Sequence, residues 1–223
     1  MDFNNQLELG SGFYTISELE KILRIPYAKA HRWINTYWDG ELGRAYQSQY
    51  SWTIEKSRAV SFHTLIEFYV MVQFAEAGVK TRSVLRAHKE LSEWYNTAHP
   101  FALKEVLSGI HTDGKTIYFK RNNDIISLDG TKQLNLGFIE MFFKNLDFDE
   151  NNLATRFWPL GREKSINIDP SRKFGHPVIS NLNIYPETIY NHIKAGDPPK
   201  YIALIYDITE QQVNDAIEYC EAA

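Results

Sequence analysis

The sequence has very little cysteine and no long apolar run. Cys220 is the single cysteine among 223 residues, so the chain cannot form an intramolecular disulfide, and a reducing compartment is favoured. The first ten residues lack the basic start and apolar core of a signal peptide. Even the most apolar stretch, residues 65–74, is too short to cross a membrane. We therefore expect a cytoplasmic protein with no membrane partner.

The common catalytic motifs are also absent. The seven histidines show no metal-binding spacing such as HExxH, and one cysteine cannot build a zinc site. There is no G-x-S-x-G elbow, P-loop or dinucleotide fingerprint. Asp147, Asp149 and Glu150 form an acidic cluster without the spacing of a calcium loop, which favours a solvated turn. We expect no cofactor, no metal and no enzymatic activity, although a site assembled from distant positions stays open.

The charges are unevenly distributed along the chain. The net charge is −4, which argues against a protein coated with nucleic-acid-binding cations. Between residues 21 and 60, however, seven cations stand against three acids. From residue 161 onward the balance reverses, with six cations and nine acids. A local basic block on an acidic protein is the electrostatic pattern expected of a confined DNA contact.

Residues 14–38 have the pattern of a helix-turn-helix. Ser17 and Glu20 fit an N-terminal capping box, and Pro26 separates a first short helix from a second. The second helix has one apolar side and otherwise carries polar and cationic residues. Its candidate DNA contacts are Tyr27, Lys29, His31 and Arg32. The alternative is an ordinary helical hairpin whose cations are solvated.

The segment that follows suggests a wing. Residues 39–57 are rich in Gly, Ser, Gln and Tyr and run into the β-like stretch 59–62. We expect a loop closing onto a small strand, with Arg44, Lys56 and Arg58 near the phosphate backbone. A plain surface loop is an equal alternative.

The remaining pattern predicts a mainly α (α+β) fold with three units, at residues 1–100, 101–165 and 166–223. The predicted elements are an amphipathic helix over 64–77, a helix from 81, β-hairpins over 110–136, a helix over 138–146, strands at 156–158 and 165–168, and three helices over 186–195, 199–206 and 209–219. Asp113-Gly114 and Asp129-Gly130 are the expected hairpin turns. The last helix carries acids and no cation, so we interpret it as a protein-contact or dimerisation element.

Two parts of the chain resemble known modules. The segments YTISELEKILRIPYAKAHRWI, AVSF and FAEAGVKTRSVLRAHKEL resemble the MerR-type winged helix-turn-helix and its following helices. The tail, with Gly175-His176-Pro177-Val178 and Ala195-Gly196, is similar to a small trihelical domain of bacterial antitoxins. In this order the two resemble the larger VapB-type antitoxins, whose partners are PIN-domain ribonuclease toxins.

The resemblance implies a protein that binds its own operator, represses its operon and holds a toxic nuclease inactive. It places the DNA-reading positions at Tyr27, Lys29, His31 and Arg32, although the family often has arginine where His31 stands. A homodimer would present two reading helices to a palindromic operator. The alternatives are a one-component regulator that senses a small ligand, and an interaction scaffold that never touches DNA.

Overall fold

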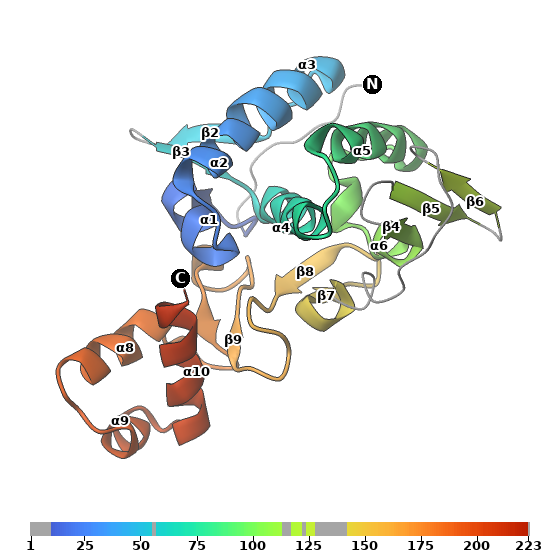
Figure 1. Cartoon of the computed structure of the whole chain (residues 1–223). Helices are drawn as coiled ribbons and strands as arrows, with labels where there is room; N and C mark the ends of the chain where they lie inside the picture. The colour runs from blue at the N-terminus through green and yellow to red at the C-terminus, as the bar shows by residue number, and fades with distance from the viewer. Residues whose placement is uncertain (1–9, 55–56, 113–116, 122–123, 128–141, 223) are drawn as a thin grey trace.

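A buried helix, α4 (Phe62–Glu76), lies at the centre of the N-terminal part of the chain in the computed structural model shown in Figure 1. Ser61 caps it by accepting a hydrogen bond from the Thr64 N–H group at 3.4 Å. Helices and small sheets surround α4 on its sides, so most of its side chains are buried. The structure describes residues 10–54, 57–112, 117–121, 124–127 and 142–222.

The elements around α4 are mostly short helices. They are α1 (Ile16–Leu23), α2 (Tyr27–Arg32), the π-helical stretch η1 (Trp33–Leu42), α3 (Gly43–Tyr46), α5 (Thr81–Tyr95), the 3₁₀ helix η2 (Pro100–Ala102) and α6 (Lys104–Gly109). The strands are β1 (Tyr14–Thr15), β2 (Ser51–Ile54), β3 (Ser57–Val60), β4 (Ile110–Thr112), β5 (Ile117–Arg121), β6 (Asp124–Ser127), β7 (Leu146–Phe148) and β8 (Ala154–Phe157). The predicted mainly helical α+β class is therefore confirmed.

The strands form small antiparallel sheets. One has the order β1-β3-β2, with Thr53 opposite Arg58 in the β2–β3 hairpin. A second has the order β4-β5-β6, and β7 pairs with β8. The predicted turns at Asp113-Gly114 and Asp129-Gly130 lie outside the described residues. Residues 142–145 are helical, and the rest of the helix predicted over 138–146 is outside the description or in β7.

One apolar core runs through this part of the molecule. It joins side chains from α1, the π-helical stretch, α4, α5, α6 and β8. Trp33, Trp38, Phe68 and Phe101 are among its largest fully buried members. The aromatic richness of the sequence is thus used to pack several short elements on α4.

The C-terminal unit has a smaller core of its own. Its elements are β9 (Ile166–Asn167), the 3₁₀ helix η3 (Lys173–Gly175), β10 (Val178–Ile179), α8 (Pro186–Lys194), α9 (Pro199–Tyr206) and α10 (Glu210–Glu221). The core includes Ile189, Ile202 and Val213, one from each helix. Thr209 and Gln212 form the capping box that begins α10. The three predicted C-terminal helices are confirmed, and α9 has the predicted bounds.

Specific contacts fix this unit to α1. His176 Nδ1 lies 3.3 Å from the Glu18 carboxylate, which belongs to α1. The Tyr14 hydroxyl is buried beside Gly175, whose φ of +86° places it in the left-handed region. Burial raises the pKa of Tyr14 well above its ordinary value, so the phenol stays neutral. Within the described residues, no helix is both long and apolar enough to cross a membrane.

Two sequence predictions about α4 and the run that leads into it are wrong. The helix predicted to be amphipathic over 64–77 begins at Phe62 and is buried on nearly all sides, because elements pack around it rather than on one face. The extended run predicted over 59–62 ends at Val60, since Ser61 turns the chain to cap α4.

Candidate nucleic-acid interface

Two carboxylates of α1 stabilise the start of α1 and the turn that leads into α2. Thr15, not Ser17, is the N-cap of α1: its hydroxyl accepts from the Glu18 N–H group at 3.3 Å, and the Glu18 carboxylate accepts from the Thr15 N–H group at 2.7 Å. The sequence contains two overlapping capping boxes, Thr15 with Glu18 and Ser17 with Glu20. Thr15 is the N-cap because its backbone is still extended in β1. Glu20 instead accepts a hydrogen bond from the Tyr27 N–H group at 3.1 Å and thus anchors the start of α2.

A single helical segment runs from residue 27 to residue 46, here called the long helix. It consists of α2, η1 and α3, and the residues at their junctions keep helical backbone angles. The loop predicted to begin at residue 39 is therefore wrong over its first part. Trp38, Leu42 and Tyr46 recur at four-residue spacing and are all buried, which continues the apolar side of the helix past its glycines.

The first turns of the long helix present the predicted reading residues to solvent. Tyr27, His31 and Arg32 are exposed, and the rings of Tyr27 and His31 stack with centroids 6.2 Å apart. Lys29 differs, because its ammonium lies 5.0 Å from the centre of the Trp33 ring. This cation–π contact draws Lys29 toward the body of the protein. Of the four predicted contact residues, two rings and one guanidinium are thus open to solvent.

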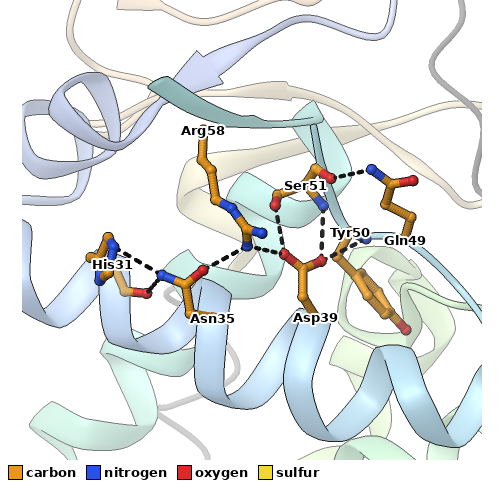
Figure 2. A network of polar contacts seen from close by, with 7 residues as sticks. All are labelled: His31, Asn35, Asp39, Gln49, Tyr50, Ser51 and Arg58. Atoms are coloured by element: carbon orange, nitrogen blue, oxygen red, sulfur yellow. Dashed lines mark hydrogen bonds and ion pairs between the residues drawn. The ribbon is translucent and has the colours of Figure 1, made fainter. Parts of the chain in front are cut away.

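The carboxylate of Asp39 joins the long helix to the β2–β3 hairpin (Figure 2). It accepts hydrogen bonds from the backbone N–H groups of Tyr50 and Ser51, both at 3.1 Å, and from the Ser51 hydroxyl at 2.6 Å. These donors lie at the start of β2. Asp39 therefore holds the hairpin at a fixed position relative to the helix.

Arg58 extends the same network toward the reading residues (Figure 2). Its Nη1 donates to Asp39 Oδ2 at 2.7 Å and to Asn35 Oδ1 at 2.6 Å. The Asn35 amide donates in turn to the His31 carbonyl at 2.9 Å and lies 3.0 Å from His31 Nε2. The Arg58 side chain is still 40% exposed. The structure thus shows Arg58 as a brace between hairpin and helix, a role the sequence analysis missed.

The π-helical stretch explains how these partners align. Side chains four residues apart on an ordinary helix are offset by about 40°, so His31, Asn35 and Asp39 would drift around it. The wider turns of a π-helix reduce this drift. Gly40 suits such a turn, because a Cβ atom at this position would lie only 2.6 Å from the Asn35 carbonyl oxygen.

Arg44 and Arg58 line one hollow of about 330 Å³ beside the Asp39–Ser51–Arg58 contacts. Arg44 projects from α3, and Asp39, Ser48 and Gln49 also border the hollow. The structure therefore brings two of the three predicted wing cations together, with Arg44 on a helix rather than a loop. Lys56, the third, lies outside the described residues.

A row of cations along α5 and at its N-cap was not predicted from the sequence. Lys80, Arg82 and Arg86 are exposed, and the latter two border a hollow of about 370 Å³ together with Glu41 and Lys89. Lys89 Nζ lies 2.7 Å from the Glu41 carboxylate of the long helix. The helical spacing of 82, 86 and 89 is the signal that could have found this row.

Buried side chains of α4 and α5 support the long helix. Trp38 packs edge-on against Phe68, with ring centroids 4.7 Å apart, and also against His88. His88 Nε2 lies 2.6 Å from the carboxylate of Glu67, and both side chains are fully buried. Burial raises the pKa of Glu67 while the neighbouring His88 opposes that rise. The long helix therefore packs on a buried layer of aromatic and polar side chains.

Comparison with known proteins finds a family model and several proteins of Mycobacterium tuberculosis to which this chain is similar. Residues 166–220 match the family described as "Protein of unknown function (DUF433)". A protein named "Putative antitoxin VapB45" is 22% identical, over 96% of this chain and 95% of its own length. "Uncharacterized protein Rv2308" is 23% identical, over 92% and 89%.

A solved structure shares the fold over nearly the whole chain. The crystal structure of Rv2018 from the same organism superposes with a TM-score of 0.68 at 17% identity, covering 97% of this chain and 99% of that one. This likeness indicates that the folds of the N-terminal part and the C-terminal unit occur together in that protein as well.

Proposed function

We propose that this chain is an antitoxin that binds operator DNA through the long helix and the β2–β3 hairpin. The observation that carries the proposal is the exposed surface of Tyr27, His31 and Arg32 on a helix that Asp39 and Arg58 lock to a hairpin. A helix of this kind, flanked by a hairpin, suits entry into a major groove. The distant similarity to a protein named as a putative antitoxin supports the antitoxin role.

The proposed contacts divide by chemistry. Arg32 and Arg44 bind phosphate oxygens, and Arg58 does so with the part of its side chain that is exposed. Tyr27 and His31 lie against base edges, where their ring edges and polar atoms read sequence. Lys29 contributes a weaker contact, because its ammonium must leave the Trp33 ring to reach DNA.

The wider activity follows the family resemblance. Two copies bind a palindromic operator, which represses the operon by blocking access to its promoter. The same chain neutralises a PIN-domain ribonuclease toxin through another surface. The proposal gives this chain no catalytic activity of its own.

Binding of a fluorescent duplex from the chain's own upstream region, measured by anisotropy at several salt concentrations, tests the DNA-binding part. We expect Arg32→Ala to weaken binding and to lower the salt slope by about one phosphate contact. Lys104→Ala is the matched control, because it removes one exposed cation from α6, away from the long helix in Figure 1. Unchanged affinity in a folded Arg32→Ala variant would contradict the proposal.

A further inference from the structure

The outer face of α9 exposes large apolar side chains. Leu204 is 80% exposed, and Tyr201 and Ile205 are each about half exposed. Their spacing of three and four residues places them on one side of the helix. The opposite side of α9 is buried through Ile202 and Ala203. Helices that are apolar on both sides are normally covered on both sides, yet among the described residues nothing covers this face.

The surroundings of this face are acidic. Asp207 ends α9 and Glu210 begins α10, and both are exposed. Lys200 is the cation that α9 itself carries. Across residues 166–223 the sequence has eight acids and four lysines or arginines. The C-terminal unit therefore offers an apolar patch within a negative field.

We propose that this face of α9, formed by Tyr201, Leu204 and Ile205, docks a basic protein partner. The inference rests on the proposed function and identifies the partner as the ribonuclease toxin. Lysine and arginine side chains are the usual phosphate contacts of proteins that bind RNA, and a nuclease surface of this kind is electrostatically complementary to the C-terminal unit. Apolar side chains at the centre and charges at the rim are the usual anatomy of such an interface.

A second copy of this chain fits the face less well. In a symmetric dimer through α9, two copies of the same patch, each with its negative surroundings, would face one another. Like charges across an interface weaken association. The position of α9 also suits a separate partner, because Figure 1 shows it at the end of the molecule opposite α3 and the β2–β3 hairpin.

On the proposed function, a PIN-domain ribonuclease gene lies beside the gene of this chain, and the test measures binding and inhibition of that ribonuclease. Leu204→Asp introduces a charge at the centre of the patch, and its native side chain supports no core packing. We expect affinity for the ribonuclease to fall about thirtyfold or more, the factor that marks an interface hot spot, and inhibition of RNA cleavage to fall with it. Asp207→Asn combined with Glu210→Gln should slow association and reduce its dependence on salt.

Phe174→Asn is the matched control. Phe174 is 75% exposed, lies outside α9 and has a φ of +57°, a conformation that asparagine tolerates. It should bind the ribonuclease like the wild type. Melting temperatures of both variants establish that they fold.

Each remaining outcome is decisive. If Leu204→Asp binds the ribonuclease as tightly as the wild type, the α9 inference is overturned and the proposed function stands. If the wild-type chain does not inhibit the ribonuclease, the toxin-neutralising function fails and the inference fails with it. If Leu204→Asp converts a dimer to a monomer and leaves inhibition intact, the face belongs to a second copy.

Discussion

Replacing Asp39 by alanine should loosen the β2–β3 hairpin from the long helix. The change removes the acceptor for the backbone N–H groups of Tyr50 and Ser51, for the Ser51 hydroxyl and for Arg58. Hydrogen bonds to a charged group contribute about 1.5–3 kcal/mol each, and the bonds share one carboxylate, so they do not add fully. The ion pair with Arg58 adds less than about 1 kcal/mol, because Arg58 is 40% exposed. We expect a loss of about 3 kcal/mol in the free energy of unfolding.

Two assays check this expectation. In urea unfolding, the wild type should be the most stable, Asp39→Asn less stable and Asp39→Ala the least stable. Asparagine keeps one acceptor oxygen, whereas alanine keeps none. Hydrogen exchange should show lost protection at the amides of Tyr50 and Ser51, while the amides of α9 stay unchanged. A stability loss below about 0.5 kcal/mol with full protection at both amides would refute the reasoning.

The DNA affinity of Asp39→Ala, on the proposed function, separates the bracing role of Asp39 from the effect of its charge. Asp39 is negative, so simple electrostatics predicts that its removal strengthens binding to phosphates. The bracing role predicts the opposite, because a hairpin that is free to move must be ordered again on DNA. We expect the affinity of Asp39→Ala to fall. Tighter binding would mean that Asp39 acts through its charge alone.

Two further changes address the rest of the structure. Gly175→Ala should destabilise the chain by about 1–3 kcal/mol in thermal or urea unfolding, because Gly175 has a φ of +86° and an added Cβ would collide with the Tyr14 hydroxyl. Wild-type stability in this variant would show that the contact between Tyr14 and Gly175 adjusts at little cost. His99 is buried with a pKa well below its ordinary value, so the unfolded chain binds the proton more tightly and stability should fall as pH drops below about 6.5. His99→Gln should flatten this dependence by up to about 1.4 kcal/mol per pH unit, measured by urea unfolding between pH 5 and 7.5; an identical slope in both proteins would exclude His99 as its source.

Local patterns in the sequence were sufficient to predict many of the helices. Periodicity and capping residues predicted the three C-terminal helices, because their starts are marked by proline or threonine and their inner faces by isoleucine and valine. The start of the long helix was also predicted, since Pro26 and the buried side at Ala30 and Trp33 are local features. Such signals lie within one turn of the residue that they position.

The candidate site was harder to predict, because its key contacts join residues far apart in the sequence. Arg58 meets Asn35 and Asp39 across 23 and 19 residues, and the contact depends on the register of the hairpin and on a π-helical stretch. Gly40 and Gly43 favoured a loop by composition, whereas the buried Trp38 and Leu42 side chains keep the segment helical. Tertiary packing thus outweighed local propensity.

The C-terminal unit is held to α1, the helix that directly precedes the long helix in the chain. Glu18 caps α1 and also contacts His176, so α1 and the C-terminal unit share one carboxylate. Arg156 pairs with Asp169 nearby, at 3.2 Å, and ties β8 to the start of that unit. A connection made of several specific contacts fixes orientation better than a linker does. On the proposed function, a ribonuclease bound at α9 would therefore be carried at a set distance from the operator, and both ligands could be held together.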